Sequence, residues 1–497
     1  MDERYKKYLT IVKYINDPVY GQIGLTEAET KLVDTRAFQR LRSLRQLARV
    51  NYVFPGTEHS RFVHSLGVLH NMSLMTEHLH EIGDFDYEDV FKLRISAILH
   101  DIGHYPLSHL GEAAYSYLLE IDRAHISIED DASPEDDDAF SKVYKMASSH
   151  SKAAHHESLG QVVVQNNSEI SKILSLYDLD PNEIGGIFRG VRGSANYVYT
   201  QLIHSNLDAD RLDYLLRDSF QSGLKYGMVD LGYLINLLGV KKSNLIPTGD
   251  EEDETNLLVF NAKGKHVIEH FLMARYFHYT QFVLHKTGTA FEGMIKAMYI
   301  KLIRSGDTKF MFKSLDDIHG HIDDERFYTF TDSFLEYELY DYNEKTDDED
   351  FKILYNCYVK RIRPKTLFEY KDRHGNQEEP KLTLFKNILE NRPDEISHIM
   401  GTDLWGYTIA GPSIEQMPNP VINPNEIDED MIEKMVEAIK IFDENGNISF
   451  LAEDPSMTIK DLISKKVEFV RVYCMDPDKE SEYSSIRKKL KELFEGR

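Results

Sequence analysis

The sequence is poor in cysteine, in positive charge and in long apolar runs. Its 497 residues include two cysteines, Cys357 and Cys474, and neither lies at a spacing typical of a metal ligand set. So few cysteines exclude a disulfide framework and fit a reducing compartment, and we expect a cytoplasmic protein. No apolar run approaches the roughly 18 residues of a membrane helix. Residues 1–7 lack the apolar core of a secretory signal, so we expect no membrane association.

The charge balance is strongly acidic. The formal net charge is −25, from 83 acidic and 58 basic side chains. Nonspecific nucleic-acid binding needs a basic surface, so nucleic acid is not an expected partner. A small polyanionic substrate remains compatible with this balance, because a local group of arginines can create positive potential inside an acidic protein. The chain is too long for one hydrophobic core, so we expect two or three domains.

Helical periodicity dominates the first 305 residues. A strand pair is expected over 10–25, and Thr26 to Glu29 form a capping box that opens a helix. The apolar spacing predicts helices over 36–49, 64–82, 87–100, 158–176, 182–189 and 202–220, then a strand from about 257 and one long helix over 266–303. An acidic run over 129–138 predicts a solvated loop, with a flap over the neighbouring histidines as the alternative.

The last hundred residues change in character. Proline and asparagine become frequent, and the alternating run 467–473 is typical of a strand. We therefore predict a mainly α protein with small β elements and a small α+β C-terminal lobe. The expected division is a catalytic domain with an N-terminal regulatory segment over 1–305, a helical extension over 306–399 and the C-terminal lobe over 400–497.

The chemistry is concentrated in residues 99–109, which contain His100, Asp101, His104 and His109. His64 lies near the start of one predicted helix, and His100 and Asp101 end the next. Antiparallel neighbours joined by a short loop bring those two ends together. Two imidazoles and a carboxylate are typical ligands of a divalent ion, and imidazole favours Mn, Fe, Ni or Zn over Mg.

A further carboxylate ligand is expected from the predicted helix around residue 210. Asp210 and Asp213 are three residues apart and share a helix face, whereas Asp208 points elsewhere. Spacing alone leaves Asp208, Asp210 and Asp213 open, with Asp210 favoured.

Four motifs occur in a fixed order, at 52–56, 60–67, 100–109 and 208–214. Together they resemble the HD-domain deoxynucleoside triphosphate triphosphohydrolases, a family that includes the bacterial dGTP triphosphohydrolases and the animal SAM-and-HD-domain restriction factor. The resemblance spans roughly residues 10–305, with a weaker match at 469–474. It implies an HD-type helical core, one divalent metal per subunit (Mn, Fe, Ni, Zn or Mg) and cleavage of a dNTP into deoxynucleoside and inorganic triphosphate. It also implies a homo-oligomer, with a tetramer favoured.

The resemblance implies a role for each matching residue. The metal ligands it implies are His64, His100, Asp101 and Asp210. The catalytic residues it implies are His104, His109, His156 and Glu112, with His109 as the acid that protonates the departing 5′-oxygen. The substrate-binding residues it implies are Arg61, Arg211 and Arg275 for phosphates, Tyr214 and Asp218 for the sugar, and Gln46 and Leu47 where a 2′-hydroxyl is refused. A GTP or dNTP effector site is implied at Asp34, Gln39 and Arg42.

Two positions depart from the family pattern. Val283 stands where the animal enzyme has a sugar-stacking tyrosine, and Gly232 stands where it has a regulatory arginine. These departures put nucleoside preference and one effector site in question. Two other functions are therefore kept: an HD-type phosphodiesterase or nucleotidase acting on other nucleotides, and a nucleotide-sensing module that is latent until a partner binds.

Overall fold

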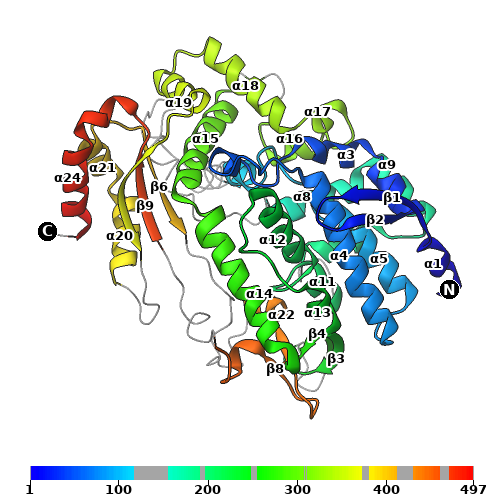
Figure 1. Ribbon diagram of the computed structural model, residues 1–497. Coiled ribbons are helices and arrows are strands. Elements are labelled where there is room, and N and C mark those ends of the chain that lie inside the picture. Colours follow the sequence, from blue (N-terminus) through cyan, green and yellow to red (C-terminus); the bar gives the residue numbers. More distant parts are fainter. Residues whose placement is uncertain are drawn as a thin grey trace.

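A computed structural model gives the arrangement of the chain (Figure 1). Helices make up most of it, and the predicted mainly α class is confirmed. None of the helices in the part of the chain that the structure describes is both long and apolar enough to cross a membrane. The predicted acidic loop at 129–138 lies outside the described residues, which are 2–116, 155–190, 196–247, 254–306, 308, 311–371, 380–410, 429–458 and 469–495.

The N-terminal elements form as predicted. Strands β1 (Ile11–Asp17) and β2 (Gly21–Thr26) pair as an antiparallel hairpin. Helix α2 (Glu27–Val33) then opens with the expected capping box, in which Thr26 N donates to Glu29 Oε2 at 2.8 Å. The buried Glu29 carboxylate also accepts from Arg94, and this ion pair ties the hairpin to the helices behind it.

The prediction of one helix over 36–49 is wrong. Only α3 (Arg36–Gln39) is α-helical, and two 3₁₀ turns follow, η1 (Arg40–Ser43) and η2 (Val50–Tyr52). The reason is a distant partner, because the Asp332 carboxylate accepts from the backbone N–H groups of Arg45, at 3.0 Å, and Leu107, at 2.7 Å. Residues 44–49 therefore leave the helical path.

Three helices carry the metal-ligand candidates. α4 (Arg61–Glu81) and α5 (Tyr87–Leu99) are antiparallel neighbours, as predicted, and α12 (Ala209–Ser222) packs against α4. The predicted helix over 202–220 is two helices, α11 (Tyr197–Ile203) and α12, because Asp208 caps α12 by accepting from Arg211 N. Fully buried apolar side chains on these helices build the core around the site; examples are Leu69, Met72, Leu93, Ile98 and Leu215.

The predicted long helix over 266–303 is also interrupted. It consists of α14 (Lys265–His278), a π-helical turn η5 (Tyr279–Val283) and α15 (Lys286–Ser305). His285 begins the second part as an N-cap, and its side chain accepts from Thr287 N at 3.3 Å. The helices before this region are α8 (His156–Asn166), α9 (Ser168–Leu176), α10 (Pro181–Phe188) and α13 (Leu231–Asn236).

Strands from the last hundred residues complete two sheets that begin earlier in the chain. One sheet has the order β3 (Leu238–Ser243), β4 (Thr255–Asn261), β7 (Lys440–Phe442), β8 (Ile448–Phe450). The other has the order β5 (Lys365–Lys371), β9 (Phe469–Cys474), β6 (Trp405–Ala410). The domain limits predicted at 305 and 400 therefore do not coincide with the edges of the sheets.

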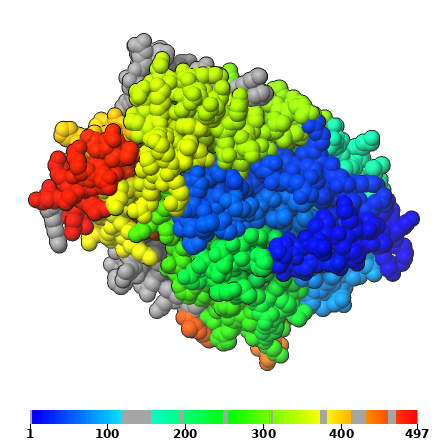
Figure 2. All heavy atoms as spheres, turned by 45° about the horizontal axis from the view of Figure 1, so that its top comes forward, coloured from blue at the N-terminus to red at the C-terminus, as the bar shows by residue number. Residues whose placement is uncertain are grey.

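The remaining helices enclose this framework. The first hundred residues (blue) form a band across one face, with the α12–α15 region (green) on one side and residues after 310 (yellow-green) on the other (Figure 2). The two chain ends lie on opposite sides of the molecule (Figure 1). The bounds of these outer helices are α1 (Asp2–Tyr8), α16 (Leu315–His319), α17 (Glu325–Tyr328), α18 (Asp332–Lys345), α19 (Glu349–Val359), α20 (Pro380–Asn391), α21 (Pro393–Met400), α22 (Glu429–Glu437) and α24 (Tyr483–Glu495).

Candidate active site and metal centre

The four predicted metal ligands converge from three segments. His64 lies in the first turn of α4, His100 and Asp101 follow the end of α5, and Asp210 lies in the first turn of α12. His64 Nε2 is 2.9 Å from Asp210 Oδ1 and 3.6 Å from Asp101 Oδ2. His100 Nε2 is 3.3 Å from Asp101 Oδ1 and 4.0 Å from Asp210 Oδ1. His64, His100 and Asp101 thus form a group that could hold one ion, and Asp210 lies beside both histidines.

The two histidine rings are oriented as metal ligands. The Nδ1 of His64 lies 2.7 Å from Asp213 Oδ2, and the Nδ1 of His100 lies 2.7 Å from the Ala97 carbonyl. Each contact holds the proton on Nδ1 and leaves the Nε2 lone pair facing the cluster. Both Nε2 atoms are buried and make no hydrogen bond of good geometry among the described residues. Two such nitrogens beside two carboxylates fit a divalent cation.

The structure separates the three aspartates that the sequence left open. Asp208 caps α12 and pairs with Arg211, and Asp213 supports His64 from behind. Only Asp210 faces the Nε2 side of the histidines. Burial opposes its ionisation, but His64 and His100 lower the pKa of Asp210 to about 2. The carboxylate is therefore available as a ligand at neutral pH.

A buried chain of charges stabilises Asp213. Arg217 Nε and Nη2 donate to Asp213 at 2.9 and 3.0 Å, and Arg217 Nη1 donates to Asp17 at 2.8 Å. Burial opposes ionisation here too, yet the Arg217 guanidinium and His64 lower the pKa of Asp213. Gly67 makes room for this pair, because a Cβ at that position would lie 1.8 Å from Asp213 Oδ1.

A second cluster lies beside the metal-ligand candidates and contains the four predicted catalytic residues. His156 Nδ1 is 2.9 Å from Glu112 Oε2, and His109 Nδ1 is 3.4 Å from the same oxygen. The rings of His104 and His156 stack with centroids 3.8 Å apart. His104 Nε2 lies 3.1 Å from Asp101 Oδ1, which connects the two clusters.

The histidines of this catalytic cluster differ in environment. Burial and the nearby Arg61 hold the pKa of His104 well below its usual range. Burial also opposes protonation of His156, but Glu157 and Glu112 outweigh it and raise the pKa of that ring. His109 is the exposed member, with 64% of its side chain accessible. It follows Leu107 and Ser108, which have φ values of 59° and 55° in the left-handed region.

The predicted substrate-binding residues surround these clusters. Arg61 donates to Asp101 Oδ2 and to Ser108 Oγ, both at 2.9 Å, so it bridges the metal-ligand candidates and the turn before His109. Arg275 donates to Asn206 Oδ1 at 2.9 Å, and Arg211 pairs with Asp208. The Tyr214 hydroxyl is buried and has no hydrogen-bond partner in the described part of the chain.

Asp218 is less accessible than its predicted role with the sugar requires. Its carboxylate is 1% exposed and lies 3.0 Å from His59 Nε2 and 2.8 Å from His278 Nε2. Sequence analysis missed these two histidines. No local motif marks them, since each comes from a segment far from residue 218.

A cavity of about 490 Å³ opens next to His109. Gln46 and Leu47 line it, and so does Val283. Its volume suits a nucleoside-sized ligand. The opposite wall comes from η5, α15 and β6 and includes Tyr279, Glu292, Lys296, Tyr407 and Thr408, which sequence analysis did not identify.

The predicted effector segment is partly assembled. Gln39 Nε2 donates to the Val33 carbonyl at 2.7 Å, and its Oε1 accepts from Arg42 Nε at 2.7 Å. The Arg42 guanidinium lies 3.5 Å from the centre of the Phe62 ring, and Asp34 is exposed. The structure brings Gln39 and Arg42 into contact, and among the described residues the Asp34 side chain bonds to neither of them.

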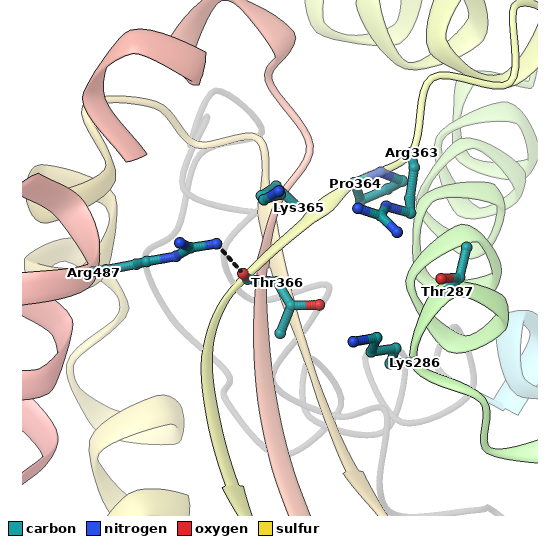
Figure 3. A pocket seen from close by; sticks show the side chains of 7 residues that line it. All are labelled: Lys286, Thr287, Arg363, Pro364, Lys365, Thr366 and Arg487. Atoms are coloured by element: carbon teal, nitrogen blue, oxygen red, sulfur yellow. Dashed lines mark hydrogen bonds between the residues drawn. The ribbon is translucent and has the colours of Figure 1, made fainter. Parts of the chain in front are cut away.

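A smaller cavity of about 140 Å³ has a basic lining (Figure 3). Lys286 comes from the start of α15, and Arg487 comes from α24. Lys365 is the first residue of β5, and Arg363 lies two residues before it. Arg487 Nη2 donates to the Thr366 carbonyl at 3.3 Å. We refer to these four cations as the basic pocket. Sequence analysis did not identify this pocket, although the closely spaced basic residues at 361–365 are a signal that could have pointed to it.

Comparison with known families identifies one domain of this chain. The family model described as "HD domain" matches residues 61–216, which include all four metal-ligand candidates. The chain therefore contains an HD domain over these residues, as the resemblance implies.

The chain is similar to several known proteins over part of its length. The chain is 30% identical over 309 residues to an uncharacterised protein of Methanocaldococcus jannaschii, covering 62% of this chain and 54% of that one. It is 26% identical over 377 residues to the deoxynucleoside triphosphate triphosphohydrolase SAMHD1 of Xenopus laevis, covering 73% and 56%. It thus spans about half the length of these two relatives. A solved structure of a phosphohydrolase from Bacteroides thetaiotaomicron has the same fold, with a TM-score of 0.61, 24% identity and coverage of 93% and 99%.

Proposed function

We propose that this protein is a metal-dependent dNTP triphosphohydrolase, which releases a deoxynucleoside and inorganic triphosphate. The observation that carries the proposal is the adjacency of three features. They are a group of two histidines and one aspartate with Asp210 beside it, a cluster of three histidines around Glu112, and a nucleoside-sized cavity. His104 joins the ligand group to the histidine cluster, and His109 joins that cluster to the cavity. The similarity to SAMHD1, whose name states this activity, supports the substrate class.

The roles of the residues follow from their positions. A divalent ion, with Mn the first to test, would polarise a phosphoryl oxygen and promote attack by water on the α-phosphorus. The bond from this phosphorus to the 5′-oxygen breaks, and the leaving oxygen takes a proton. His109 is the proposed donor, because it alone of the cluster is exposed on the cavity side. Glu112 accepts from His109 and from His156, and so holds both rings in place.

The deciding experiment is an assay of products. Purified protein with Mn²⁺ is incubated with each dNTP and each NTP, and the products are separated by ion-exchange chromatography. Release of triphosphate supports the proposal. Release of monophosphate or diphosphate supports the phosphodiesterase or nucleotidase alternative. The matched control is Asp210→Asn, which removes one ligand charge and should abolish release.

Regulation by a nucleotide is part of the proposal. The Gln39–Arg42 contact and the four cations of the basic pocket offer places for a base and for phosphates. We expect GTP or a dNTP to stimulate hydrolysis, and we expect Lys365→Ala to weaken that stimulation. Protein that hydrolyses nothing until a partner or effector is added would favour the latent sensing module. Light scattering with and without nucleotide tests the proposed oligomer, for which a tetramer is favoured.

A further inference from the structure

Glu292 lies in the wall of the large cavity. It belongs to the second turn of α15 and is half-buried, and the same cavity is lined by His109 from the catalytic cluster. Among the described residues, no hydrogen bond or ion pair to the Glu292 carboxylate is found. The other titratable side chains that line the cavity are His109, Tyr279, Lys296 and Tyr407.

An unpaired carboxylate in such a position is costly. A half-buried carboxylate without a partner loses part of the hydration that water would give it. In accord with this, burial alone raises the pKa of Glu292 to about 7, and no neighbouring charge offsets the effect. His109 already has a partner in Glu112, and Lys296 has an interaction of its own. In the described chain the cavity therefore presents one carboxylate without a partner, Glu292, and one amide oxygen without a partner, Gln46 Oε1.

The chemistry of that partner follows from the acceptor. A carboxylate has two oxygens in one plane, so it best fits a ligand with two adjacent N–H donors. Guanine has this pattern, because its ring N1–H lies beside its exocyclic 2-amino group. Adenine and cytosine place a ring acceptor beside their amino group, and thymine has one N–H between two carbonyls. The acceptor pattern thus favours guanine over the other three bases.

We propose that Glu292 is the residue that reads the base and makes the site prefer guanine. The inference rests on the proposed function, since it places a deoxynucleoside in this cavity with its triphosphate toward the metal-ligand candidates. In that arrangement His109 lies near the 5′-oxygen, while Glu292 meets the base. Glu292 is a specificity-determining residue and takes no part in the bond cleavage.

The test compares two nucleosides that differ in one amino group. Deoxyinosine lacks the 2-amino group of deoxyguanosine but keeps N1–H. Binding of each to the full chain with Mn²⁺ is measured by calorimetry, and kcat/KM is measured for dGTP and dITP. We expect the wild type to prefer the guanine compounds at least tenfold. In Glu292→Gln, which keeps the size of the side chain, we expect that preference to fall to about twofold.

Two further variants complete the design. Glu292→Ala removes the acceptor and should also lose the preference, so the result does not depend on the glutamine variant alone. Glu349→Gln, at an exposed position in α19 that is 78% accessible, is the matched control and should behave as wild type. Retention of the full preference in Glu292→Gln and Glu292→Ala would overturn the inference, as would a wild type that treats both nucleosides equally. Absence of hydrolysis of every dNTP would instead overturn the proposed function and the inference with it.

Discussion

Asparagine in place of Asp213 removes one negative charge from behind His64 with almost no change in volume. The Asp213 side chain is fully buried. Its carboxylate accepts hydrogen bonds from His64 Nδ1 at 2.7 Å and from two N–H groups of Arg217 at 2.9 and 3.0 Å. The substitution leaves His64 without its orienting carboxylate, and it leaves Arg217 with Asp17 as its remaining acidic partner. Both the metal affinity and the stability of the fold are therefore expected to fall.

The size of each effect can be bounded. Loss of a carboxylate that orients a metal-ligating histidine typically costs 10- to 100-fold in metal affinity. Breaking a buried ion pair costs about 3–5 kcal/mol. Arg217 keeps Asp17, and asparagine still offers one acceptor, so we expect a loss near the lower end, about 2–3 kcal/mol. Gly67→Ala should produce the same two losses, because its Cβ would displace the Asp213 carboxylate.

Mn²⁺ binding by calorimetry and unfolding in denaturant measure the two effects separately. Asp178→Asn is the control, since Asp178 forms a surface pair with Arg4 at 2.6 Å and its side chain is 65% exposed. The free energy of unfolding of that variant should differ from that of the wild type by no more than about 0.5 kcal/mol. Unchanged metal affinity in Asp213→Asn would refute the argument that this carboxylate orients His64.

Three further outcomes are expected. His109→Ala should lower kcat about 100-fold or more while metal content, measured by mass spectrometry, stays normal; full activity would refute its role as the acid. Affinity for deoxyguanosine should fall about fivefold between pH 7 and pH 6, because the Glu292 carboxylate, with its pKa raised to about 7, becomes protonated and stops accepting; Glu292→Gln should lack this dependence. Removal of metal by a chelator should abolish hydrolysis and lower the midpoint of thermal unfolding, and Mn²⁺ should restore both. An unfolding midpoint that does not change with metal would contradict the ligand assignment.

Local patterns predicted those parts of the fold whose partners are near in sequence. The capping box at Thr26 and Glu29 depends on residues three positions apart, and the apolar spacing of α4 and α5 depends on one helix face. The pairing of His64 with His100 follows from two helices joined by a short loop. A short window of the sequence is enough to show such features.

Other features of the fold depend on a partner distant in the chain, and no local pattern shows them. Arg45 leaves the predicted helix because the carboxylate of Asp332, 287 residues away, accepts its N–H. Strand β7 joins β4 although some 180 residues separate them, and the sheet therefore crosses the predicted domain limits. Glu292 follows the same rule, because only the assembled cavity shows that this glutamate lacks a partner.

The candidate site owes its geometry to the ends of helices. His64 and Asp210 lie in the first turns of α4 and α12, where free N–H groups favour negative charge, and His100 is the C-cap of α5. Each ligand is thus attached to a rigid element, yet it projects from an end where no neighbouring turn covers it. A side chain in the middle of these tightly packed helices would be enclosed by the core. The same placement explains why hydrophobic periodicity predicts the helices well but does not locate the ligands. Only the chemistry of their side chains identifies the ligands.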